Sequence, residues 1–192
     1  MRVNRRPARP DQLFSLPLAS SPEDALAAEA NAAIPAWEAV SDLGIAMILI
    51  ATAGDANVTM GKLHRFATRF PDVRVVLDHL GYPDPKLWPE TFGFSPMHHA
   101  LAGHRNIYYK FTSLLLRVLG LQASDLKGFL DYAVALYGAE RMVWGSDFGN
   151  VDGGPFDYLQ QTVDATDHMT YAVRRAMFFD TAYRLFASRK AA

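Results

Sequence analysis

The chain of 192 residues is long enough for one domain with a full hydrophobic core, and its 50% hydrophobic and 20% charged composition is that of a globular protein. A formal net charge of -1 gives no reason to expect nucleic acid or an acidic membrane as a partner, and no apolar run reaches membrane-spanning length. Because the chain has no cysteine, disulfides and thiolate chemistry are excluded, and only His, Asp or Glu side chains are available to hold a metal ion. No apolar segment follows the basic N-terminus, so we expect no secretion signal and predict a cytoplasmic protein.

The order of apolar segments along the chain predicts an α/β fold. Strands are expected at residues 2–4, 45–51, 73–78, 106–112 and 141–145. Apolar residues at helical spacing, with Ser, Pro and Gly at the ends, predict helices at residues 22–33, 35–43, 60–70, 97–102, 125–137, 157–166 and 171–186. A strand, a helix and a strand in this order form a βαβ unit, and its crossover makes the two strands parallel. The chain therefore predicts one unit with a parallel sheet.

Polar side chains follow two of these strands at the point where the apolar run ends. Asp78 and His79 come after one strand, and Ser146 and Asp147 come after the last. In parallel α/β folds, side chains at strand ends lie at the ligand-binding edge of the sheet. We therefore expect His79 and Asp147 to converge on one face, within about 12 Å by the spacing of strands. Asp78 is expected to be structural, because alternation along the strand would point it away from His79.

Three segments, VRVVLDHLG (73–81), NIYYKFTS (106–113) and RMVWGSDFG (141–149), resemble the amidohydrolase-related (amidohydrolase 2) family of TIM-barrel hydrolases. The resemblance implies a TIM-barrel-type (β/α) barrel with its active site at the C-terminal ends of the strands. His79 matches the mid-barrel histidine of the family and Asp147 its last-strand aspartate. The His-x-His pair of the family's first strand is absent, since no two of the six histidines are spaced i, i+2. We therefore predict that residues 1–192 form a single partial barrel domain that lacks the N-terminal strands.

The resemblance also implies roles for particular side chains. Asp147 would act as a general base toward water, and His79 would polarise a carbonyl or bind a metal ion. Zinc is possible from the family, but His79 and Asp147 are only two ligands where a catalytic zinc normally has three, so we expect weak binding or none. A substrate carboxylate would be bound by basic and hydroxyl side chains, for which Lys110, Thr112, Arg5 and Arg6 are the candidates.

The predicted function is hydrolysis of a lactone or amide of a small carboxylated molecule. A decarboxylase of the same family is an alternative, as is a non-catalytic barrel fragment that serves as an oligomeric or binding subunit. Five strands cannot close an eight-stranded barrel, so the exposed edges predict a homo-oligomer and little activity from this chain alone. His98 and His99 are adjacent on an expected helix, cannot chelate one ion together, and are expected at the surface or in a lid.

Overall fold

The computed structural model describes residues 14–17, 33–51, 54–120, 123–150 and 154–187. Within them is one sheet in which every neighbouring pair of strands is parallel and strand order follows the sequence: β1 (Phe14–Pro17), β2 (Ala46–Ile50), β3 (Arg74–Leu77), β4 (Ile107–Thr112) and β5 (Met142–Gly145). Sequential parallel strands joined by helical crossovers are the arrangement of a (β/α) barrel. The predicted α/β class and the parallel sheet are confirmed.

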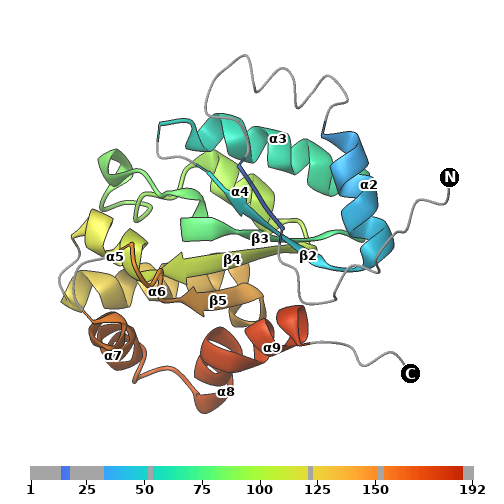
Figure 1. The fold of residues 1–192 in the computed structure, drawn as a ribbon. Helices are drawn as coiled ribbons and strands as arrows, with labels where there is room; N and C mark the ends of the chain where they lie inside the picture. The colour runs from blue at the N-terminus through green and yellow to red at the C-terminus, as the bar shows by residue number, and fades with distance from the viewer. Residues whose placement is uncertain (1–13, 18–32, 52–53, 121–122, 151–153, 188–192) are drawn as a thin grey trace, which may run out of the picture.

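The helices follow the strands around the sheet, from α2 and α3 near β2 to α7, α8 and α9 beyond β5 (Figure 1). Their bounds are α2 (Ile34–Leu43), α3 (Ala56–Arg69), α4 (Pro96–Ala102), α5 (Ser113–Leu119), α6 (Ala123–Tyr137), α7 (Pro155–Ala165), α8 (Tyr171–Arg175) and α9 (Thr181–Phe186). A π-helical turn, Ala176–Asp180, joins α8 to α9, so the final helix is continuous in space as expected but not uniformly α-helical.

Alternation along the strands gives the sheet two different faces. In β4, Tyr109 and Phe111 are fully buried in the main core, which the helices cover. Tyr108, Lys110 and Thr112 alternate with them and belong to the opposite face. On that face a smaller apolar cluster, centred on Ala46, Val76 and Val143, packs against Leu185 of α9. Polar side chains at the carboxyl end of this second face are therefore free to form a site.

Several element bounds differ from expectation. β1 lies at Phe14–Pro17, whereas the strand expected at residues 2–4 lies outside the described residues. The helix α5 (Ser113–Leu119) was not expected, because its apolar sequence shows no polar face and it follows β4 without a loop. The helix expected from residue 60 begins four residues earlier, since α3 starts at Ala56.

Within the described chain, β1 and β5 are each paired on one side only. An unpaired strand edge can pair with a strand of another chain, and on this ground the homo-oligomer stays our prediction. None of the described helices combines the length and the apolar character needed to cross a membrane.

Candidate active site

The first part of the site is the turn that follows β3. The strand ends at Leu77, and Asp78–Gly81 forms a 3-10 turn in which His79 and Leu80 have φ values of 53° and 52°. Non-glycine residues rarely adopt positive φ, and such strain costs about 1–3 kcal/mol per residue and is concentrated at functional sites. Gly81 also has a φ of 77°, and a Cβ there would lie 2.9 Å from the sulfur of Met60. The turn is therefore held in a conformation that this sequence adopts only under tight packing.

This turn corrects the expectation for Asp78. The alternation of a strand stops at Leu77, so the side chains of Asp78 and His79 both turn toward the site, and each residue is only 5% exposed. One oxygen of Asp78 accepts a hydrogen bond from the His79 backbone N–H at 3.1 Å. The other lies 4.0 Å from His79 Nε2. Asp78 is therefore a member of the site as well as a structural residue.

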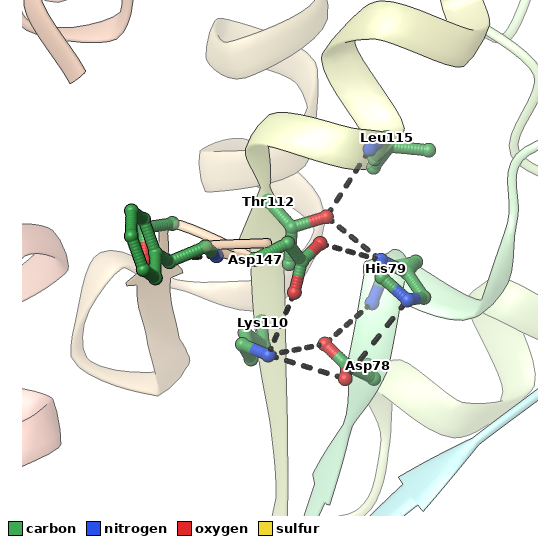
Figure 2. A network of polar contacts seen from close by, with 8 residues as sticks. Asp78, His79, Lys110, Thr112, Leu115 and Asp147 are labelled. Carbon is green, nitrogen blue, oxygen red and sulfur yellow. Dashed lines mark hydrogen bonds and ion pairs between the residues drawn. The ribbon is translucent and has the colours of Figure 1, made fainter. Parts of the chain in front are cut away.

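β4 supplies a cation and a hydroxyl from the face of the sheet opposite the main core. Lys110 Nζ lies 3.0 Å from Asp78 Oδ1 and 3.4 Å from Asp147 Oδ1, so a single ammonium bridges two carboxylates (Figure 2). The Thr112 hydroxyl lies 2.7 Å from His79 Nδ1 and accepts a hydrogen bond from the backbone N–H of Leu115 at 3.2 Å. The side chain of Lys110 runs over Gly145, where any Cβ would collide with it. The position of Lys110 thus depends on a glycine in the neighbouring strand.

Asp147 completes the site just after β5. Its φ of 46° lies in the left-handed region, where Asp and Asn are tolerated better than most residues. Asp147 Oδ2 lies 3.5 Å from His79 Nδ1, so the expected convergence of these two side chains is confirmed by the geometry. This oxygen is buried, and among the described residues it has no hydrogen-bond partner. Asp147 therefore has a buried lone pair available to accept a proton.

The electrostatics of the site favour a neutral imidazole. Burial lowers the pKa of His79, and the ammonium of Lys110 acts in the same direction, while Asp78 and Asp147 oppose the shift. The ring of Tyr82 lies 4.8 Å from that of His79, centroid to centroid. Burial raises the pKa of Tyr82, and both nearby carboxylates add to the effect. With one formal charge counted for each of Asp78, Asp147 and Lys110 and none for His79, the group has one net negative charge.

Asp78, His79 and Asp147 also offer donor atoms of the kind that metal ions use, and one donor atom of each lies within 4.8 Å of the others. The sequence led us to expect two such donors, and Asp78 offers a third. Lys110, however, already balances the charge of both carboxylates, and an ammonium in that position repels a divalent cation. As arranged, these residues fit a tightly held metal ion poorly, and the reason is Lys110 rather than the ligand count.

His98 supports the turn from behind and was wrongly expected at the surface. It is only 2% exposed, and its Nδ1 accepts a hydrogen bond from the Ser95 backbone N–H at 3.0 Å, as part of the capping box that begins α4. Its Nε2 faces Gly81, at 3.3 Å from where a Cβ on that residue would lie. His99 is exposed as expected. The burial of His98 depends on the packing of α4, which the sequence pattern does not reveal.

Burial lowers the pKa of His98 to about 4, and the carbonyls of Gly81 and Leu80 only partly oppose this shift. An unfolded histidine has a pKa of about 6.5, so between these values the unfolded chain binds the extra proton. As the pH falls from about 6.5 to about 4, protonation of His98 in the unfolded chain should lower the free energy of unfolding by about 3 kcal/mol, with no further loss below about pH 4. Urea unfolding of the wild type and of His98→Gln across this range measures the effect. Gln preserves a capping-box acceptor without titrating, and equal pH dependence in both proteins would contradict the assignment.

A parallel β/α sheet, with buried carboxylate and imidazole groups and a partly buried ammonium at the carboxyl ends of its strands, defines an incomplete TIM-barrel-type protein with an enzyme-like site. A family model described as Amidohydrolase matches residues 8–187, so the chain belongs to the amidohydrolase family. The family resemblance, expected from three short segments of sequence, is thereby confirmed.

Individual relatives agree with this assignment. The chain is 34% identical over 113 residues to an L-fucono-1,5-lactonase from Burkholderia ambifaria, a match that covers 54% of this chain and 37% of that protein. Among solved structures, an amidohydrolase from Burkholderia multivorans with bound zinc has a TM-score of 0.71 at 20% identity, covering 92% of this chain and 64% of that one. A protein from Pseudomonas putida, described as a putative 2-pyrone-4,6-dicarboxylic acid hydrolase, has a TM-score of 0.68 at 24% identity, covering 91% and 62%. The chain thus spans less than two thirds of the length of each of these relatives.

The predicted site residues are only partly brought together. His79, Asp147, Lys110 and Thr112 form one group. Arg5 and Arg6 lie outside the described residues, so their expected contact with a substrate carboxylate stays a prediction. Lys110 is already bonded to two carboxylates, which favours charge balance within the site over the substrate-binding role expected for it. Tyr82 was missed, although its place three residues after His79 was a usable signal.

Proposed function

We propose that this chain carries the proton-transfer part of a lactone-hydrolysing site, in which Asp147 is the general base and His79 polarises the carbonyl. One observation carries the proposal: Asp147 Oδ2 is buried and lacks a hydrogen-bond partner in the described chain, yet it lies 3.5 Å from His79 Nδ1. A buried acceptor without a partner is costly, so its retention at a strand end suits a group that bonds to a reactant.

Each residue has a defined task in this reaction. Asp147 takes a proton from water as the water oxygen bonds to the carbonyl carbon of the lactone. The carbonyl oxygen becomes negative and accepts a hydrogen bond from His79, which carries its proton on Nε2 when the Thr112 hydroxyl donates to Nδ1. The ring C–O bond then breaks, Asp147 returns its proton to the departing oxygen, and the product is a hydroxy acid. Lys110 keeps the two carboxylates in place and limits their repulsion.

Lactones are favoured over amides and over decarboxylation by the relative with the highest identity reported above, which is an L-fucono-1,5-lactonase. That enzyme is longer than the part matched here, so its activity is a proposal for this chain and not a property of it. From the sequence we expected a lactone or amide of a small carboxylated molecule as substrate, weak binding of zinc or none, and a cytoplasmic location. These three stay predictions.

A pH-stat assay of the purified chain against simple lactones, with amide hydrolysis and release of carbon dioxide measured in parallel, tests the proposal. Because His79 must be neutral and burial lowers its pKa from 6.5, the acid limb of kcat/KM should have its midpoint below pH 6.5, where His79 becomes protonated. An acid limb centred above pH 6.5 would contradict the role of a buried neutral imidazole. Carbon dioxide release without lactone hydrolysis would favour a decarboxylase, and no turnover at all would favour a non-catalytic fragment.

A further inference from the structure

A cavity of about 820 Å³ lies between β5, α7, α8 and the π-helical turn that follows α8, and the reaction proposed above does not use it. α7 and α8 lie beyond β5, at the end of the sheet (Figure 1). The volume is toward the upper end of the range of about 300–1,000 Å³ that is usual for small-molecule sites. The cavity is therefore large enough to hold a whole small molecule.

The cavity and the catalytic group belong to different faces of the sheet. Trp144 of β5 lines the cavity and lies beside Phe111 of β4, whose side chain is buried in the main core. The preceding residue, Val143, lies beside Lys110 on the opposite face, where the catalytic group is formed. A ligand in the cavity would therefore lie on the other side of β5 from the reacting groups.

The polar part of the cavity wall is basic. Arg174 and Arg175 both line the cavity, and none of the described residues that line it is acidic. Arg175 is already paired, because its Nε lies 3.1 Å from each carboxylate oxygen of Asp180. Arg174 has no ion pair within the described chain, and its hydrogen bond there is a long one, 3.4 Å, to the carbonyl of Val163. The partly buried guanidinium of Arg174 therefore has donors left for an anion.

The rest of the wall is apolar. Leu159 and Val163 are four residues apart in α7, so they line the cavity from one face of that helix. Tyr171 and Phe179 line it as well and are 77% and 56% exposed, so their rings form its open rim. Apolar surface that is left in water gains free energy when a ligand covers it. A ligand with an apolar body and an anionic head would match both parts of the wall.

We propose that this cavity is a second binding site, for an amphiphilic carboxylate with an apolar chain. The guanidinium of Arg174 donates two parallel hydrogen bonds to the carboxylate head. The chain lies between the aliphatic side chains of α7 and the rings of Phe178 and Phe179. The inference does not depend on the proposed lactone hydrolysis, because the two sites share no residue.

Isothermal titration calorimetry with octanoate, 1-octanol and acetate tests the head and the chain separately. Octanoate should bind the wild type about 10- to 100-fold more tightly than 1-octanol, because a hydrogen-bonded charge pair is missing with the alcohol. Acetate, which has the head without the chain, should not bind measurably. Arg174→Gln should weaken octanoate binding by about the same 10- to 100-fold and leave 1-octanol unchanged. Arg105→Gln, at an exposed arginine outside the cavity, is the matched control and should change neither.

Tryptophan fluorescence locates the bound ligand. Of the three tryptophans in the chain, Trp144 is the one that lines the cavity. Octanoate should change the emission of the wild type but not that of Trp144→Phe, which should still bind octanoate in the calorimeter. Asp147→Asn should bind octanoate as the wild type does, because Asp147 belongs to the catalytic group on the other face of the sheet.

Absence of octanoate binding, equal affinity for 1-octanol, or binding that Arg174→Gln leaves unchanged would overturn the inference. A change of affinity in Asp147→Asn alone would place the carboxylate in the catalytic group and would overturn it too. A dimer that Phe179→Ser dissociates, seen by light scattering together with no octanoate binding, would identify a second copy of the chain as the occupant instead. Thermal melts check that each variant is folded, and Arg174→Gln should be, since it loses only the long bond to Val163.

Discussion

Replacement of Asp147 by Asn should lower kcat for lactone hydrolysis by about two to four orders of magnitude, because general base catalysis contributes about that much. The amide of Asn occupies the same volume but cannot take a proton from water. Asn also tolerates the positive φ of 46° at this position, so the backbone has no reason to rearrange. Steady-state kinetics on a lactone that the wild type hydrolyses is the measurement.

The same assay on Asp72→Asn gives the control for loss of an aspartate charge, because Asp72 is exposed and precedes β3, at the opposite end of that strand from Asp78 and His79. Thermal melts separate a catalytic effect from a folding defect: Asp147→Asn should unfold cooperatively like the wild type. If Asp147→Asn retained more than about a tenth of the wild-type kcat, another group would have to be the base, since one lost proton acceptor costs far more than that.

The strands and the two central site residues were predictable because their signals are local. β2 to β5 are mostly apolar runs, and the structure places each within one residue of its expected bounds. His79 and Asp147 were found because polar residues that end such runs lie at the carboxyl edge of a parallel sheet. Nothing about their convergence required knowledge of the helices.

The remaining site residues depend on geometry that no local pattern encodes. Asp78 joins the site because His79 and Leu80 adopt positive φ immediately after the strand, and alternation gives the opposite answer there. His98 is buried because α4 packs behind that turn, although its sequence neighbour His99 is exposed. Lys110 was predicted to bind the substrate, because its sequence neighbours do not reveal its ion pairs. Its two carboxylate partners, Asp78 and Asp147, follow β3 and β5, and only the folded sheet brings them together.

Replacement of Lys110 by Met should destabilise the protein by about 3–5 kcal/mol, because it leaves two buried carboxylates without their shared cation. The side chains of Asp78 and Asp147 are 7% and 8% exposed, so water screens their repulsion poorly. Zinc should then take the place of the ammonium, using the donor atoms of Asp78, His79 and Asp147 that lie within 4.8 Å of one another. At about 100 times its Kd, zinc would return about 2.7 kcal/mol to the free energy of unfolding.

Urea unfolding and competition with a chromophoric chelator, each with and without zinc, measure both effects. The wild type should bind zinc weakly and gain little stability from it, whereas Lys110→Met should bind it stoichiometrically.

Lys127→Met is the matched control, since Lys127 also lies 3.0 Å from a carboxylate, that of Asp131, but both side chains are more than 40% exposed. An exposed pair of this kind contributes about 0.3–0.5 kcal/mol, so this variant should neither unfold easily nor gain zinc affinity. Adding His79→Gln to Lys110→Met should abolish the gain, because only two carboxylate ligands remain from this group. Stoichiometric, tight zinc binding by the wild type would instead show that Lys110 moves aside for the ion. The ammonium would then control access to the metal site and would not replace the metal ion.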